Sequence, residues 1–329
     1  MIDRRRLLLA GAASAVAASW PVFAQKARVP RIGYLVLSPL SDTPSRERQA
    51  FLDALRELGY VAGKTIEIVY ASAQNEQDFV DDVCRDLLGR KPDLIVVSGA
   101  IATLAAKKAT ASVPIVFMAL GDPVGIGAVR SLARPGGNVT GVSFISSELA
   151  GKRVQLVKEM VPAAKRVAVL WDSRNANARA ESDAALAAAA SLQLKAEPIV
   201  LASDADLPRA LNRLQANKPD LLYVAFEGGI VASNRTLIAE FGVRHRVPVV
   251  SGWSNLTEAG GLISYAPDIP AMFRRSASYV DRILRGAKPA ALPVEQATTV
   301  ELVVNARTAK ALGIAIPREI LLRADRVIQ

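Results

Sequence analysis

The chain of 329 residues is poor in the residue types that most often build metal and nucleophilic sites, since it has one histidine and one cysteine. Cys84 has no partner for an intramolecular disulfide, and we interpret it as a small buried residue of a helix rather than a reactive thiol. His245 lies between two arginines at a predicted helix end, where histidine favours the helix dipole. The sequence offers neither a nucleophile–base pair nor a His/Cys ligand set. It therefore predicts a protein that is not an enzyme, with no metal and no cofactor.

Aromatic residues and long apolar runs are also scarce. Phe, Trp and Tyr make up 5% of the chain, against 22% charged residues and a formal net charge of +10. The tightest basic clusters, at 244–246 and 274–275, contain no aromatic residues, which argues against a nucleic-acid groove. No apolar run is long enough to cross a bilayer.

The first residues have the pattern of an export signal. Arg4–Arg6 form a basic segment, Leu7–Ser19 form a short Leu/Ala-rich segment, and Val22–Ala24 has the small-x-small character of a cleavage site. We predict a signal peptide over residues 1–24, of the Sec or the twin-arginine type, and a periplasmic, soluble mature protein. No cysteine lies at the cleavage point, so a lipoprotein is not expected.

The chain contains an internal repeat. The segment 91–97, Lys-Pro-Asp-Leu-Ile-Val-Val, returns at 218–224 as Lys-Pro-Asp-Leu-Leu-Tyr-Val, and the Val-Pro-Ile-Val of 113–116 returns at 247–250 as Val-Pro-Val-Val. Copies about 130 residues apart are much longer than a solenoid unit, so they indicate two similar lobes.

Within each repeat, short β-branched runs alternate with amphipathic helical stretches. This βαβ order predicts an α/β fold of two doubly wound, parallel-sheet, Rossmann-like lobes. The predicted strands are Ile32–Leu37, Thr65–Tyr70, Leu94–Val97, Ile115–Met118, Val167–Trp171, Ala196–Val200, Leu221–Val224, Val249–Ser251, Leu262–Tyr265 and Val300–Val304.

A Gly-rich stretch, Gly121 to Gly141, is interpreted as the first crossing between the lobes. Within it, Gly125-Ile-Gly127-Ala-Val-Arg130 is similar to a dinucleotide-binding loop. Arg130 occupies the third glycine position, and the segment follows the fourth strand rather than the first. Nucleotide binding is therefore not predicted.

Ligands of open parallel sheets bind at the carboxyl ends of the strands, where helix N-termini present free N–H groups. This rule selects candidate ligand-binding residues in both lobes. Hydroxyl and backbone N–H groups at the first-lobe strand ends can bind a ligand carboxylate. Acidic side chains can bind an ammonium group, and aromatic rings can supply an apolar or cation–π wall. Residues of these types also cap helices without any ligand. The candidates are Ser38, Ser98, Gly99, Thr103, Asp122, Asp172, Phe226, Glu227, Trp253 and Ser254.

Several sequence blocks carry a family resemblance over essentially the whole mature chain. They are Gly121-Asp-Pro-Val with the following Ser-Leu-Ala-Arg-Pro-Gly-Gly-Asn-Val-Thr-Gly141, Gly260-Gly-Leu-Ile-Ser-Tyr265, Leu292-Pro-Val-Glu-Gln296, Asn305-Ala-Arg-Thr-Ala-Lys-Ala-Leu-Gly313 and Arg323-Ala-Asp-Arg-Val-Ile328. Together they resemble the ABC-transporter substrate-binding protein family that includes tryptophan- and other aromatic amino-acid-binding members. Ala266, Ala297 and the segment 254–256 depart from the usual pattern of that family.

The resemblance implies a type I periplasmic binding protein whose two lobes are joined by three crossing segments. It predicts a first lobe of residues 29–145 plus 266–291 and a second lobe of residues 146–265 plus 292–329. It also places the predicted helix Pro270–Arg285 on the first lobe.

The sequence as a whole predicts an exported, monomeric solute receptor of an ABC importer. We expect hinge closure around an amino acid, including aromatic ones, or a related small carboxylate, followed by delivery to a membrane-embedded ABC permease. Two alternatives stay open at this point. One is a sensor or effector domain without a transporter, and the other is an exported enzyme.

Overall fold

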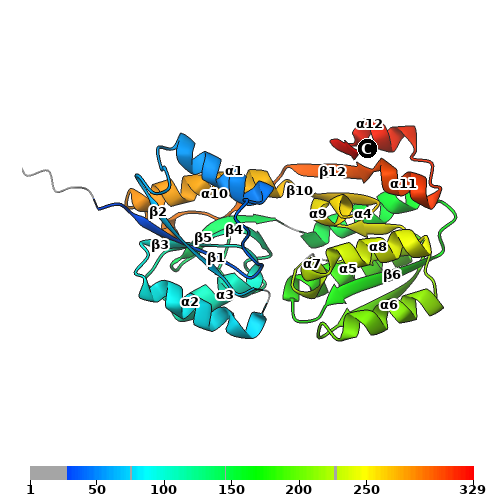
Figure 1. Cartoon of the computed structure of the whole chain (residues 1–329), viewed down its shortest axis with the longest axis horizontal. Helices are drawn as coiled ribbons and strands as arrows, with labels where there is room; N and C mark the ends of the chain where they lie inside the picture. The colour runs from blue at the N-terminus through cyan, green and yellow to red at the C-terminus, as the bar shows by residue number, and fades with distance from the viewer. Residues whose placement is uncertain (1–27, 75, 145, 226–227) are drawn as a thin grey trace, which may run out of the picture.

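The computed structural model describes residues 28–74, 76–144, 146–225 and 228–329. The predicted signal peptide lies outside these residues. Two α/β lobes lie side by side along the long axis of the molecule (Figure 1). The described helices include none that is long and apolar enough to cross a membrane.

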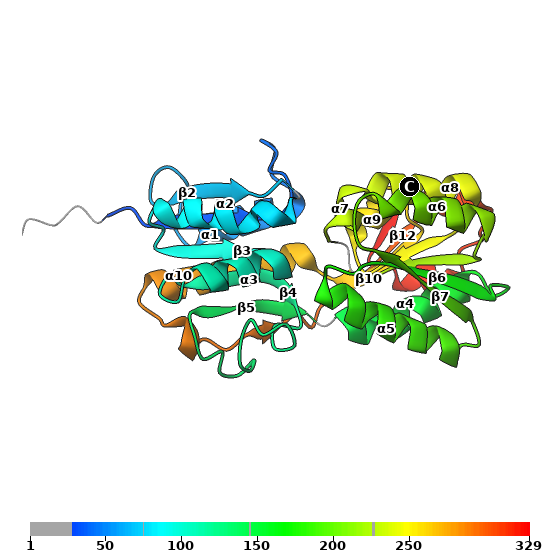
Figure 2. The same cartoon turned by 90° about the horizontal axis from the view of Figure 1, so that it is seen from below.

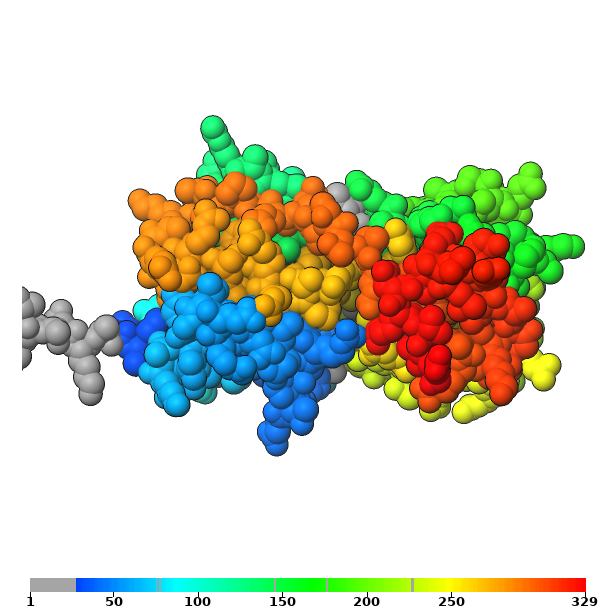
Figure 3. Space-filling view, turned by 90° about the horizontal axis from the view of Figure 1, so that it is seen from above, coloured from blue at the N-terminus to red at the C-terminus, as the bar shows by residue number. Residues whose placement is uncertain are grey.

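The first lobe is a six-stranded sheet of order β11-β5-β4-β3-β1-β2, in which every pair is parallel. Its helices cover both faces, with α2 and α3 on the face seen from below (Figure 2) and α1 beside α10 on the other (Figure 3). The elements are β1 Arg31–Val36, α1 Arg46–Glu57, β2 Glu67–Ser72, η1 Gln77–Phe79, α2 Val80–Gly89, β3 Leu94–Val97, α3 Ala100–Ala109, β4 Ile115–Gly121, β5 Val139–Phe144, α10 Ile269–Leu284, η2 Pro289–Ala291 and β11 Glu295–Gln296.

The second lobe repeats this arrangement in a seven-stranded sheet of order β13-β12-β10-β9-β8-β6-β7. Its pairs are parallel except for β10 with β12, which is antiparallel. The elements are α4 Ser146–Met160, β6 Arg166–Asp172, α5 Ala176–Ser191, β7 Lys195–Leu201, α6 Asp206–Ala216, β8 Leu221–Val224, α7 Ile230–Ser233, α8 Arg235–His245, β9 Val249–Ser251, α9 Ser254–Glu258, β10 Ile263–Pro267, β12 Val300–Asn305, α11 Ala306–Leu312, α12 Arg318–Arg323 and β13 Arg326–Ile328.

Helix α1 shows how the sequence forms these layers. The Ser45 side chain accepts a hydrogen bond from the Arg48 backbone N–H at 3.3 Å and caps the first turn. Phe51 and Leu55 are four residues apart and fully buried against the sheet, which stabilises the packing by about 2 kcal/mol each. Gly59, with a φ of 89°, turns the chain into the next segment.

All ten predicted strands are present, with bounds that differ from the expected ones by at most three residues, which confirms the two-lobed parallel α/β fold. The described residues contain three further strands, β5, β11 and β13, that the sequence patterns did not predict. The expected helix at 270–285 packs on α1 and β4 of the first lobe.

The interpretation of Gly121–Gly141 as the first crossing was wrong. This stretch is a loop inside the first lobe, and it leads into β5, which pairs with β4. The reason is the close approach of the two strands at Gly141. A side-chain carbon there would lie 2.0 Å from the carbonyl oxygen of Phe117, so glycine permits the pairing.

The chain passes between the lobes after β5, after β10 and after β11. Residues 292–329 were expected in the second lobe, but β11 at 295–296 pairs with β5 in the first sheet. The last crossing therefore follows Gln296. There the backbone N–H of Ala297 donates to the Ser143 carbonyl at 2.8 Å, and that of Asp268 donates to the Thr299 carbonyl at 3.2 Å.

Candidate functional site

A cavity of about 620 Å³ lies between the lobes. Its first-lobe wall comes from the end of β1, the loop that follows it, the start of α1 and the start of α3. Its second-lobe wall comes from residues after β6, β8 and β9. These are the carboxyl ends of parallel strands, where α/β sheets bind ligands. The volume is within the range of roughly 300–1,000 Å³ typical of small-molecule sites.

Four of the predicted site residues line this cavity, namely Ser38, Ser98, Gly99 and Trp253. Gly99 is the N-cap of α3 and has a φ of 82°, a conformation that residues with a side chain rarely adopt. A side-chain carbon at Gly99 would have no atom within 4 Å. The predicted contact of these four residues with a ligand stays a prediction.

Four other predicted residues are not part of the cavity wall. Thr103 is fully buried and donates a hydrogen bond through its hydroxyl to the Gly99 carbonyl at 2.7 Å. Asp122 is exposed and accepts the Gly125 N–H at 2.9 Å, which closes a local turn. Ser254 is the first residue of α9.

Asp172 is also outside the wall, because its carboxylate is bonded within its own lobe. The side chain is fully buried and forms an ion pair with Arg174, with 3.1 Å between the guanidinium and the carboxylate. It also accepts the Ile230 N–H at 3.1 Å at the start of α7. Phe226 and Glu227 lie outside the described residues.

The cavity wall also contains residues outside the list of ten candidates: Tyr34, Arg48, Asn175, Arg235, Asn255 and Phe273. Arg48 and Asn255 lie in the first turns of helices that follow a strand, and Asn175 is the N-cap of α5. Extending the strand-end rule into the first turn of the following helix would have found all three. Tyr34 and Phe273 were not separable from core residues by pattern.

Aromatic side chains contribute part of the apolar surface of the wall, beside aliphatic residues such as Leu37 and Ile101. Trp253 of the second lobe packs edge-on against Phe144 at the end of β5, with ring centroids 5.3 Å apart and planes at 82°. Tyr34 packs against Tyr70 with centroids 5.4 Å apart. Burial raises the pKa of Tyr34, so its phenol stays neutral at physiological pH. The cavity thus has aromatic faces from both lobes.

One charged residue from each lobe forms an ion pair across the edge of the cleft. Arg46, the first residue of α1, forms an ion pair with Glu258 of α9 at 3.1 Å. Glu258 also pairs with Arg326 at 2.6 Å, and Arg326 pairs with Glu301 at 3.3 Å. This bridge joins the first lobe to a charge network on the second.

A buried charge cluster in the second lobe contacts two of the crossing segments. Arg153 of α4 and Glu181 of α5 are both fully buried and form an ion pair at 2.8 Å. Arg153 also donates to the Tyr265 carbonyl at 2.6 Å and to the Ser146 carbonyl at 3.0 Å. Ser146 follows the first crossing and Tyr265 precedes the second, so this one guanidinium ties both crossing segments to the second lobe.

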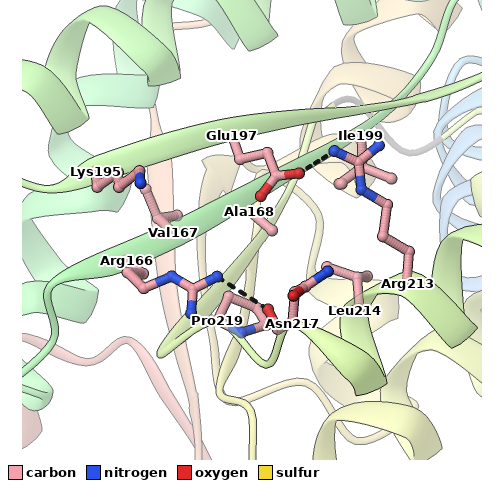
Figure 4. A pocket seen from close by; sticks show the side chains of 10 residues that line it. All are labelled: Arg166, Val167, Ala168, Lys195, Glu197, Ile199, Arg213, Leu214, Asn217 and Pro219. Atoms are coloured by element: carbon pink, nitrogen blue, oxygen red, sulfur yellow. Dashed lines mark hydrogen bonds and ion pairs between the residues drawn. The ribbon is translucent and has the colours of Figure 1, made fainter.

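A smaller cavity of about 70 Å³ lies in the second lobe at the opposite ends of β6 and β7 (Figure 4). The Arg213–Glu197 ion pair and the hydrogen bond from Arg166 to the Asn217 carbonyl at 3.1 Å close its two sides. Its volume is far below that of a typical ligand site. No group of three or more His, Cys, Asp or Glu residues in the described parts of the chain is arranged to hold a metal ion.

Comparison with known proteins gives a consistent result. A family model described as ABC transporter substrate binding protein matches residues 36–328. The chain is 26% identical over 279 residues to a protein named tyrosine-binding protein from Clostridioides difficile (strain R20291). The aligned region covers 84% of this chain and 79% of that protein.

Two solved structures are similar over nearly their whole length. One is an ABC domain in complex with L-Trp from Streptococcus pneumonia, 28% identical, with a TM-score of 0.84 and coverage of 91% of this chain and 99% of that one. The other is a ligand-free, open substrate-binding protein with adhesive properties from Clostridium difficile. It is 26% identical, with a TM-score of 0.67, and the match covers 92% of this chain and 100% of that one.

Proposed function

This chain belongs to the family of ABC transporter substrate-binding proteins, and from that premise we propose that it is an exported receptor for an aromatic amino acid. In this proposal the ligand binds in the cavity between the lobes, the hinge closes, and the closed form docks on an ABC permease. The role is one of binding without catalysis. The observation that carries the proposal is the cavity itself, which has aromatic, hydroxyl and cationic residues contributed by both lobes.

The arrangement of the lobes supports closure as the mechanism. The TM-score is 0.84 with the L-Trp complex and 0.67 with the open, ligand-free structure, at nearly equal sequence identity. The present arrangement is therefore nearer to that of the relative solved with L-Trp than to that of the open, ligand-free relative. The Arg46–Glu258 ion pair, at 3.1 Å, joins the two lobes in this arrangement. A ligand that contacts both lobes shifts the equilibrium toward this state by its differential affinity.

The ligand class follows from the relatives and the wall together. One relative is named for tyrosine and another was solved with L-Trp. Here Tyr34, Trp253 and Phe273 supply aromatic surface on the two sides of the cavity. An aromatic ring buried between such walls gains about 0.5–1.5 kcal/mol per ring pair beyond the burial of its area.

Calorimetric titration of the mature chain with L-tryptophan, L-tyrosine and L-phenylalanine tests the proposal, with L-alanine and L-lysine as controls. We expect saturable binding of at least one aromatic amino acid. Ligand at about 100 times its Kd should stabilise the protein by about 2.7 kcal/mol, and a smaller radius of gyration should appear in solution scattering. Absence of both responses to all three aromatic amino acids would refute the proposed ligand class.

A variant pair tests the placement of the ligand. Trp253→Ala should raise the Kd of the bound aromatic amino acid about tenfold, because it removes one aromatic wall. Phe79→Ala is the matched control, since Phe79 is 58% exposed and is not part of the cavity wall. Equal affinities for the two variants would place the ligand elsewhere.

A further inference from the structure

Arg48 is the buried cation of the first-lobe cavity wall. It lies in the first turn of α1, lines the interlobe cavity, and is only 7% exposed. One terminal nitrogen donates to the Ser41 carbonyl, and the guanidinium carbon lies 5.6 Å from the centre of the Tyr70 ring. The Nε–H is buried and has no acceptor among the described residues.

No carboxylate in the described chain forms an ion pair with Arg48, although eighteen such pairs involve its other basic residues. The nearby phenols cannot replace a carboxylate, because burial raises the pKa of both Tyr34 and Tyr70. A buried charge without a counter-charge is costly. Glu47 lines the same cavity but forms no ion pair with Arg48 among the described residues, so the geometry leaves the buried guanidinium for an anionic ligand group to compensate.

The start of α3 adds a second positive feature to the same wall. Ala100, Ile101 and Ala102 line the cavity, and their N–H groups precede the first intrahelical bond, which Thr103 makes to Gly99 at 3.2 Å. The N-cap makes no side-chain hydrogen bond to these groups, and the first turn has no acidic residue. The ten-residue helix therefore presents the positive end of its dipole to the cavity without an internal counter-charge.

We propose that Arg48 and the start of α3 bind the carboxylate of the ligand on the first lobe. This inference rests on the proposed function and deepens it. It makes a free carboxylate a requirement for binding, and it makes Arg48 the side chain that selects amino acids and related carboxylates against their amides and amines. The apolar part of the ligand then extends toward Trp253 and Phe273.

The test compares each ligand with its uncharged analogue by calorimetry. L-tryptophan and L-tyrosine are titrated against L-tryptophanamide and L-tyrosinamide, which keep the ring and the amine and lose the carboxylate charge. We expect the wild-type protein to bind the acid about 10- to 100-fold more tightly than the amide, the size of a charged hydrogen-bonded contact. Wild-type affinities for acid and amide within twofold overturn the inference without any variant.

Variants locate the effect at Arg48. Arg48→Gln should raise the Kd of the acid about 10- to 100-fold and leave that of the amide within twofold, and Arg48→Lys should recover part of the loss. Arg56→Gln, on the exposed side of the same helix, is the matched control and should change neither. Equal weakening for acid and amide would show that Arg48 only anchors the Ser41 loop, which overturns the inference. If Arg48→Gln does not fold, the inference is tested by Arg48→Lys and by the ratio of the wild-type Kd values for the acid and the amide.

These outcomes separate the two proposals. A wild-type protein that binds none of L-tryptophan, L-tyrosine and L-phenylalanine refutes the proposed function, and the inference falls with it. A wild-type protein that binds aromatic amino acids, but with no preference for the free carboxylate, refutes the role of Arg48 alone.

Discussion

The ion pair between Arg153 and Glu181 predicts a large stability effect from one substitution. Glu181→Gln keeps the shape of the side chain and removes its charge. It leaves Arg153 fully buried, with only the neutral hydrogen bonds to Tyr265, Ser146 and Tyr223. Removing one partner of a buried ion pair costs about 3–5 kcal/mol, because the remaining charge is uncompensated. The free energy of unfolding of a domain is only about 5–15 kcal/mol.

Arg153 keeps its charge, and it lies where two crossing segments meet the second lobe. Burial lowers the pKa of Arg153, but the interactions with Tyr223 and Glu181 outweigh it and raise the pKa overall, so Arg153 stays protonated. Arg153 therefore cannot lower the cost of losing the Glu181 carboxylate by releasing a proton. Since Arg153 ties two crossing segments to the second lobe, the variant should also loosen the hinge and weaken ligand binding.

Urea unfolding followed by circular dichroism measures the effect. Arg179→Ala is the matched control on the same helix, since its pair with Asp183 is 73% and 67% exposed and should contribute at most about 0.5 kcal/mol. The double variant Arg153→Met, Glu181→Met should be much more stable than the sum of the single effects predicts. A loss below about 1 kcal/mol for Glu181→Gln would refute the reasoning.

Three further predictions concern the cleft edge, the third crossing and the cysteine. Arg46→Gln removes the pair with Glu258, which is 55% and 35% exposed, so we expect at most about a fivefold rise in ligand Kd by calorimetry. The hydrogen bonds from Arg275 lower the pKa of Glu295. The ionised Glu295 therefore stabilises the folded protein above the ordinary glutamate pKa, and this stabilisation is lost as the pH falls through the lowered pKa of Glu295. Arg275→Gln should raise the Glu295 pKa measured by NMR titration and reduce the pH dependence of the free energy of unfolding in that acid range. Burial raises the pKa of Cys84 to about 11, so we expect its reaction with a thiol reagent at pH about 8 to follow unfolding; fast reaction of the native protein would contradict this.

Part of the cavity wall was predictable because strand ends in a parallel sheet meet at one edge. Ser98 and Gly99 were selected by that rule alone, and they line the cavity. The same rule also selected Asp122 and Asp172, whose carboxylates are bonded to their own turn or to a neighbouring arginine. The bonds to Gly125 and Arg174 are local in sequence, whereas the bond that Asp172 accepts from the Ile230 N–H comes from a segment 58 residues away. The type of residue at a strand end therefore does not distinguish a ligand contact from a local anchor.

The sequence by itself determined the doubled α/β architecture, because hydrophobic periodicity and the two Lys-Pro-Asp segments are local properties of the chain. It did not determine β5 or the two-residue strand β11, which exist through pairing with neighbours rather than through their own pattern. Arg48 is the clearest case of a property that only the tertiary structure decided. In the sequence it is one of many helical arginines, and its lack of a counter-charge appears only when both walls of the cavity surround it. Burial and charge compensation are sums over neighbours in space, and those neighbours come from segments far apart in the chain.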